Sequence, residues 1–277
     1  APSPLQPGDP DLHVPDKLSE LRILWQDAHL VAVHKPAGWL VHRTGLDAHE
    51  TRIVQPRLRD QLGQWVYPIH RLDKGTSGVL LLALDPDSAR LAALAFAQRR
   101  VHKRYLAMVR GWPAEGPVTV DHALRPDDAP PDAPAQDAQT HFRRLATLSL
   151  AVPVDRYPTT RAALVLAEPE TGRRHQIRRH LKHLAHPILG DATHGKGAHN
   201  RWWAAHLGAG RLWLHACSLN LDHPVSGQAL ALTSPLDASF NNDWQQLLSA
   251  QPWQLDAGLT MEMAQAIGLP WPSLQPV

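Results

Sequence analysis

The sequence is poor in cysteine and has no long apolar run. A single cysteine, Cys217, cannot form a disulfide within the chain, which favours a reducing, cytoplasmic location. No apolar stretch reaches the length that crosses a bilayer, and residues 1–17 lack the basic and then apolar pattern of a secretion signal. We therefore expect no membrane partner.

Net charge is small as well, at +2 from 28 Lys and Arg residues and 26 Asp and Glu residues. Composition alone is thus weak support for a nucleic-acid partner. The charges are nevertheless segregated, because basic residues gather within 99–104 and 173–182 and acidic residues within 121–137. Such segregation suits a phosphate-facing surface, although solvated helix ends would give the same pattern.

Apolar patterning predicts an α+β fold built on a mixed sheet. Ser88 is expected to cap a helix whose apolar residues continue to residue 95, and Pro187 ends a second helix that begins near residue 177. Strands outnumber these helices, which intervene irregularly, as is typical of the α+β class. Continuous or alternating apolar residues predict strands at 30–33, 79–84, 104–109 and 162–167.

Polar residues are densest in the segment 70–78 (HRLDKGTSG), directly before a predicted buried strand. Polar side chains at a strand mouth are a frequent setting for catalysis, although an ordinary turn has the same composition. The positions of Gly75, Ser77 and Gly78 do not match the Gly-x-Ser-x-Gly of serine hydrolases. Glycoside hydrolysis normally requires two carboxylates, whereas Asp73 stands alone among basic and hydroxyl neighbours. An ionised carboxylate in this setting suits nucleophilic attack or the stabilisation of a carbocation.

Two further patterns give little support for a cofactor. Residues 190–197 (GDATHGKG) approach a phosphate-binding P-loop, but they lack the Ser or Thr after Lys196 and they follow a helix. His180, His183, His186 and His194 lack the cysteine or carboxylate spacing of a recognised zinc site. We expect neither a metal nor a nucleotide cofactor.

Four segments, taken together and in this order, resemble the signature motifs of the RluA-type pseudouridine synthases. They are residues 70–78 (HRLDKGTSG), 103–111 (KRYLAMVRG), 171–178 (TGRRHQIR) and 212–216 (LWLHA). Within that family, residues 157–161, 178–181 and 186–191 are most similar to the branch that modifies uridine 65 in the T-stem of tRNA.

The resemblance implies an enzyme that isomerises uridine to pseudouridine in structured RNA. It also implies a mixed, largely antiparallel sheet with flanking helices and a central RNA-binding cleft. It spans residues 21–236, which we expect to form a single catalytic domain with a Pro- and Asp-rich loop at 126–137. Residues 1–20 are expected to be a poorly ordered tail and residues 237–277 a C-terminal extension.

Three residues receive catalytic roles from the resemblance. Asp73 corresponds to the catalytic aspartate, which attacks the ribose or the base or assists glycosidic cleavage. Arg178 would pair with Asp73 and fix its orientation. Tyr105 would stack on the uracil and could assist proton transfer at carbon. Because the reaction is an isomerisation, it requires no redox cofactor, ATP or metal.

Five other residues are implied in substrate binding. Arg71 would fill the space that a flipped base leaves in an RNA stem and would contact the backbone. Ile177 and Leu214 would line the pocket with apolar surface that excludes water. His70 and Thr76 complete the set.

The alternatives are a pseudouridine synthase for another tRNA or rRNA site, or a non-catalytic RNA-binding protein on the same scaffold. An NTPase is a more remote one. We expect RNA as the partner, and no obligate protein partner; the sequence does not determine the oligomeric state.

Overall fold

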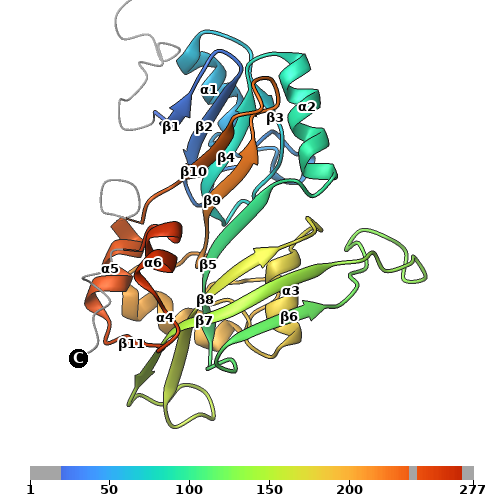
Figure 1. Ribbon diagram of the computed structural model, residues 1–277. Helices are drawn as coiled ribbons and strands as arrows, with labels where there is room; N and C mark the ends of the chain where they lie inside the picture. Colours follow the sequence, from blue (N-terminus) through green and yellow to red (C-terminus); the bar gives the residue numbers. More distant parts are fainter. Residues whose placement is uncertain (1–19, 237–241, 270–277) are drawn as a thin grey trace, which may run out of the picture.

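The computed structural model describes residues 20–236 and 242–269 (Figure 1). Of the predicted N-terminal tail, residues 1–19 lie outside this part of the chain. Residues 242–269 of the predicted C-terminal extension contain α5 (Asn242–Ala250), β11 (Gln254–Leu255) and α6 (Met261–Ile267). No helix within the described ranges has the length and apolar character needed to cross a membrane.

The described strands form one mixed sheet, in the order β1-β2-β4-β9-β5-β8-β7-β11. Three more strands lie off this path, where β10 pairs with β9, β3 with β4 and β6 with β7. All pairings are antiparallel except β4 with β9, which pair in parallel. The prediction of a mixed, largely antiparallel sheet is therefore confirmed. The other strand bounds are β1 (Arg22–Gln26), β2 (Leu30–Lys35), β3 (Tyr67–Pro68), β4 (Ser77–Ala83), β5 (His102–Arg110), β6 (Pro117–Asp121), β7 (Gln139–Leu150), β8 (Thr160–Pro169), β9 (Leu214–Asp222) and β10 (Ala229–Thr233).

Apolar runs account for the central strands. Every residue of β2 and β4 is buried, and the two strands pair from Leu30 with Ala83 to Lys35 with Gly78. A strand that is covered on both faces reads as a continuous apolar run, because neither face meets water. The four predicted strands correspond to β2, β4, β5 and β8.

Helices flank the sheet. The predicted helix near residue 88 is α2, but Ser88 is not its N-cap. Asp85 caps α2 by accepting a hydrogen bond from the Ser88 backbone N–H, and Pro86 occupies the first turn, where a missing N–H costs nothing. The four α-helices between residues 20 and 236 are α1 (Val54–Leu62), α2 (Pro86–Ala97), α3 (Gln176–His183) and α4 (Gly197–Leu207).

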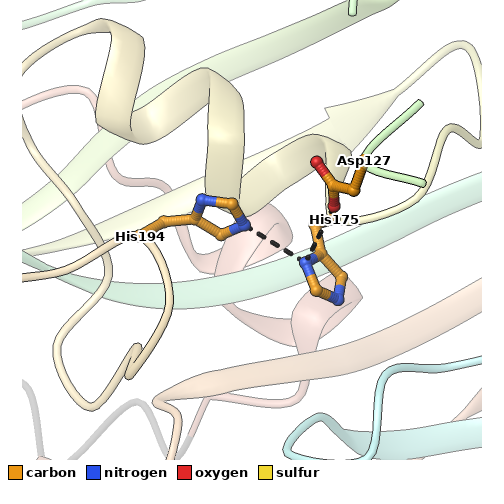
Figure 2. Close-up of side chains that lie close together, drawn as sticks. All are labelled: Asp127, His175 and His194. Atoms are coloured by element: carbon orange, nitrogen blue, oxygen red, sulfur yellow. Dashed lines mark hydrogen bonds and ion pairs between the residues drawn. The ribbon is translucent and has the colours of Figure 1, made fainter. Parts of the chain in front are cut away.

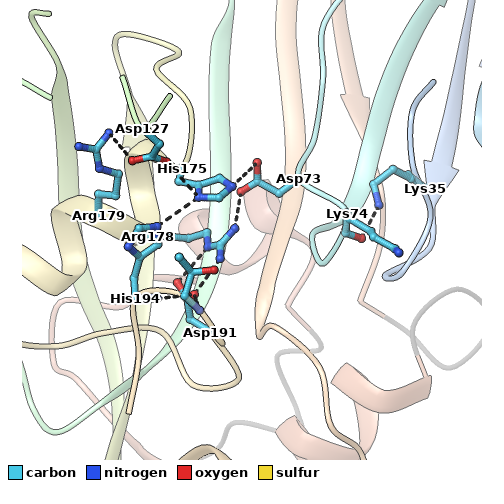
Figure 3. Close-up of polar contacts among 10 residues, drawn as sticks. Lys35, Asp73, Lys74, Asp127, His175, Arg178, Arg179, Asp191 and His194 are labelled. Atoms are coloured by element: carbon cyan, nitrogen blue, oxygen red, sulfur yellow. Dashed lines mark hydrogen bonds and ion pairs between the residues drawn. The ribbon is translucent and has the colours of Figure 1, made fainter. Parts of the chain in front are cut away.

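Two hydrophobic cores divide the sheet. One gathers β1, β2 and β4 with α1 and α2, and the other gathers β5, β7 and β8 with α3 to α6. In Figure 1, β9 and β5 lie where the two parts meet. Tyr105 on β5 packs against both cores, which places this part of β5 at their boundary. Figure 3 shows Asp73, in the turn before β4, and Arg178, near the start of α3, facing each other.

Candidate active site

A groove of about 1230 Å³ lies at the boundary of the two cores. All eight residues that the sequence nominates for catalysis or substrate binding line it. The first and the last of the nominated segments, residues 70–78 and 212–216, lie more than 130 residues apart in the sequence. The order of the strands in the sheet brings them together. The lining residues fall within 40–47, 69–76, 96–105, 169–178, 190–193 and 210–214.

Asp73 lies in the turn between β3 and β4, with its side chain 27% exposed to the groove. The turn is closed by the Thr76 backbone N–H, which donates to the Asp73 carbonyl at 3.0 Å. Arg178 Nη1 donates to Asp73 Oδ2 at 3.2 Å (Figure 3). One carboxylate oxygen is thus held by a guanidinium, while the group still faces open space.

Arg178 is itself fixed by a second carboxylate. Its Nε and Nη2 atoms donate to Asp191 Oδ2 and Oδ1 at 2.9 and 2.7 Å, the two-pronged geometry that suits a guanidinium. Burial lowers the pKa of Arg178, but the hydrogen bonds and charges of Asp191 and Asp73 outweigh it and raise the pKa overall. Arg178 is therefore a permanent cation with its planar group locked in one orientation.

Asp191 was not nominated from the sequence. It is 1% exposed, and it also accepts hydrogen bonds from the backbone N–H groups of Thr193 and His194 at 3.0 Å. Burial raises the pKa of Asp191, and the Arg178 hydrogen bonds and these N–H donors lower it further than burial raises it. In residues 190–197, the segment that resembles a P-loop, backbone N–H groups therefore bind the carboxylate of Asp191 within the same segment. The available signal was its place in residues 186–191, a segment already noted for its similarity to one branch of the family.

Tyr105 approaches the site from β5, where it pairs with Ala167 of β8 and Ala216 of β9. Burial, and secondarily the negative charge of Asp73, raise the pKa of the Tyr105 hydroxyl. The phenol therefore keeps its proton at neutral pH and is available as a hydrogen-bond donor beside the groove.

The other nominated residues differ in how far they are exposed. Ile177 and Leu214, 7% and 3% exposed, form an apolar wall of the groove, whereas Arg71 is exposed at the groove. Thr76 is 2% exposed and closes the Asp73 turn through its backbone. Their roles in binding stay predictions.

His70 makes contacts that hold the turn in place. Its Nε2 accepts a hydrogen bond from the Leu81 backbone N–H at 3.0 Å, and its ring stacks on Phe96 with centroids 4.6 Å apart. Burial, with the nearby charge of Lys103, lowers the pKa of His70 to about 3. His70 is therefore a neutral ring that ties the Asp73 turn to β4 and α2.

Lys35 is a second residue that the sequence did not nominate. It is fully buried at the end of β2, and its Nζ donates to the carbonyls of Pro36, Trp39 and Lys74 at 2.7–3.0 Å. Burial, followed by the charge of Arg211, lowers the pKa of Lys35 to about 7. Lys35 thus ties the Asp73–Lys74 turn to the neighbouring strand (Figure 3).

Residues 29–183 match the family model described as RNA pseudouridylate synthase, which is more than half of the chain. The chain belongs to this family. The resemblance to RluA-type pseudouridine synthases is thereby confirmed, and the chain is an RNA pseudouridine synthase by family.

Curated relatives extend the similarity beyond the family model. The chain is 48% identical to tRNA pseudouridine synthase C of Yersinia pestis over 240 residues, which cover 84% of this chain and 91% of the relative. It is 47% identical to the protein of that name from Vibrio cholerae serotype O1, over 84% of this chain and 97% of the relative.

Solved structures of pseudouridine synthase domains share the fold. Human RNA Pseudouridylate Synthase Domain Containing 1 superposes with a TM-score of 0.66 and 26% identity, covering 91% of this chain and 96% of that one. Human RNA Pseudouridylate Synthase Domain Containing 4 superposes with a TM-score of 0.57 and 29% identity, over 82% and 92% of the two chains. The RNA pseudouridylate synthase fold thus covers most of the present chain.

Proposed function

We propose that this protein isomerises uridine to pseudouridine in tRNA, with Asp73 as its catalytic carboxylate. The observation that carries the proposal is the Asp73 carboxylate, held by Arg178 at 3.2 Å and open to the groove. The groove volume, about 1230 Å³, exceeds the roughly 300–1,000 Å³ of most small-ligand sites. It therefore has room for a nucleotide with part of its backbone.

The reaction rearranges one nucleoside and needs no outside electron source. The N1–C1′ bond breaks, a C5–C1′ bond forms, C5 loses a proton and N1 gains one. Asp73 acts as a nucleophile on the ribose or the base, or supports the developing cation during cleavage. Arg178 holds the carboxylate in one orientation, which lowers the entropic cost of reaching the target atom.

Access to a base in a stem requires that the base leave the stack, at a cost of a few kcal/mol. Arg71 is exposed at the groove and has the planar cationic side chain that can occupy the vacated space. Tyr105 stacks on the extruded uracil, while Ile177 and Leu214 exclude water from the intermediate. Thr76 and His70 shape the turn that presents Asp73.

Phosphate contacts come from both basic clusters of the sequence. Arg99 and Lys103 from the first, and Arg173 and Arg174 from the second, line the same groove. Their convergence supports RNA binding better than the net charge does, because local potential steers a polyanion.

We propose uridine 65 in the T-stem as the target. The support is the similarity of residues 157–161, 178–181 and 186–191 to that branch of the family and the shared name of the relatives, tRNA pseudouridine synthase C. We also propose a cytoplasmic location, since Cys217 is a free, buried thiol. The alternatives are another tRNA or rRNA site, or RNA binding without catalysis.

Two experiments test the function. With purified protein and unmodified tRNA, Asp73→Asn is expected to abolish pseudouridine formation while tRNA affinity changes little, and Asp60→Asn, an exposed aspartate on α1, is expected to keep wild-type activity. If the wild type forms no pseudouridine on tRNA, activity on tRNA is ruled out, and an rRNA site or RNA binding without catalysis is left. Mapping pseudouridine across total tRNA and rRNA from cells with and without the protein identifies the position.

A further inference from the structure

Three metal-ligand side chains converge beside the groove, within the described part of the chain. Figure 2 shows Asp127, His175 and His194 turned toward one another, and one ligand atom from each lies within 4.8 Å of the other two. His175 Nδ1 lies 3.1 Å from His194 Nε2 and 3.8 Å from Asp127 Oδ2. The sequence did not predict this cluster, because Asp127 comes from the 126–137 loop, His175 directly precedes α3 and His194 lies in the connection between α3 and α4.

We propose that Asp127, His175 and His194 bind one Zn²⁺ ion per chain, and that the bound ion inhibits the enzyme through His175. The inhibitory part rests on the proposed function, whereas the binding part does not. Tetrahedral zinc with bonds of 2.0–2.2 Å places its ligand atoms about 3.3 Å apart. The observed separations surround that value, so a shift of the exposed Asp127 side chain completes the three protein ligands.

The donor set selects the kind of metal. Two imidazoles and one carboxylate suit Zn²⁺ and its neighbours in the transition series, whereas Mg²⁺ and Ca²⁺ prefer oxygen alone. Arg178 and Arg179 lie close by, but both are paired with carboxylates.

The surroundings also provide the outer contacts of a metal site. Asp127 Oδ1 lies 3.7 Å from Arg179 Nη1, which orients the carboxylate. On the other side, His175 Nε2 lies 3.9 Å from Asp73 Oδ1. A carboxylate behind a metal-bound histidine is the usual arrangement, because the metal on one ring nitrogen places the proton on the other.

That last contact couples the site to the reaction. With Zn²⁺ on Nδ1, His175 carries its proton on Nε2, facing Asp73. A side-chain shift of roughly 1 Å brings the Nε2–H group within hydrogen-bond distance of Asp73 Oδ1, the oxygen that Arg178 leaves open, and this lone pair is then no longer available to the uridine. We therefore expect Zn²⁺ to lower kcat and to leave tRNA affinity nearly unchanged.

Binding is tested by calorimetry with ZnCl₂ on EDTA-treated, buffer-exchanged full-length protein, without RNA. The wild type is expected to bind one Zn²⁺ per chain, and His194→Ala and Asp127→Asn are each expected to weaken that binding at least about tenfold. His206→Ala removes an exposed histidine of α4 that does not line the groove, and it is expected to bind Zn²⁺ as the wild type does. Wild-type protein that binds no Zn²⁺, or equal binding by all four proteins, would overturn the site.

Inhibition is tested by single-turnover pseudouridine formation with and without Zn²⁺, in the wild type and in His194→Ala with the same tRNA. Zn²⁺ is expected to slow the wild type at least tenfold more than the variant. Because both proteins act on the same tRNA, any effect of Zn²⁺ on the RNA itself cancels in this comparison. If His194→Ala weakens Zn²⁺ binding but Zn²⁺ slows the wild type and the variant equally, the inhibitory role is overturned. Failure of the metal-free wild type to form pseudouridine overturns the proposed function instead, and the calorimetry still decides the site.

Discussion

Arg178 Nη1 donates a 3.2 Å hydrogen bond to Asp73 Oδ2, which joins the first turn of α3 to the turn before β4. These elements belong to different hydrophobic cores, so the pair spans the boundary that the groove follows. The bond therefore places the carboxylate relative to both walls of the groove.

Asp191→Asn is expected to lower kcat at least tenfold and to cost about 3 kcal/mol of unfolding free energy. The substitution leaves a buried guanidinium with one carboxylate partner in place of two, and the loss of a buried partner has this magnitude. Steady-state kinetics and urea unfolding measure the two effects. KM for tRNA is expected to stay within about threefold, because Asp191 acts through Arg178. Asp60→Asn is the control, and a kcat loss of the same size in that variant would contradict the positioning role.

Tyr105→Phe is expected to lower kcat about 100-fold or more while tRNA affinity is kept, since the ring still stacks and the proton donor is lost. The raised pKa of the Tyr105 hydroxyl means that it donates a hydrogen bond at neutral pH and does not serve as the initial base. Single-turnover rates and filter binding give the two quantities. Wild-type turnover by the variant would leave Tyr105 with a stacking role alone.

Stability is expected to fall as the pH drops below about 6.5. Burial is the main cause that lowers the pKa of His34 to about 4 and those of His70 and His215 to about 3. The unfolded chain takes up these protons near pH 6.5. The stabilisation is therefore complete above that pH and is lost progressively as the pH falls toward 3, by up to about 1.4 kcal/mol per pH unit for each group.

His34→Asn tests this linkage without removing a polar partner from Ser234, whose hydroxyl lies 2.8 Å from His34 Nδ1. Urea unfolding between pH 4.5 and 7.5 is expected to show a slope smaller by about one proton in the variant. Equal slopes in the two proteins would rule out His34 as a contributor.

Gly78→Ala is expected to destabilise the protein by several kcal/mol, on the order of 3 or more. Gly78 has φ +129°, and an added Cβ would lie 2.2 Å from the Ala216 carbonyl oxygen, in the backbone of β9. The strands cannot separate there without breaking their parallel pairing. Gly63→Ala, at φ +68° with no atom within 4 Å of the new Cβ, is expected to cost about 1 kcal/mol. Thermal unfolding of the two variants measures the difference, and similar losses would show that backbone strain alone accounts for both.

Local sequence was enough to predict the α+β class, four central strands and the helix that carries Arg178. Apolar periodicity encodes these features over a few residues, because it reflects which face of an element is buried. Four short motifs also nominated eight residues, all of which line the groove. The Ser88 cap was wrong, since Asp85 and Pro86 together offered a better start to the same helix.

Tertiary structure decided the contacts of those residues. The bond from Arg178 to Asp191, the burial of Lys35 and the approach of Asp127 to His175 depend on sheet order and loop paths, which no local pattern encodes. The sequence supplied the charged groups. Their pairing, and hence the orientation of Asp73, came from packing two cores against one sheet, because only packing brings distant charges within a few ångströms.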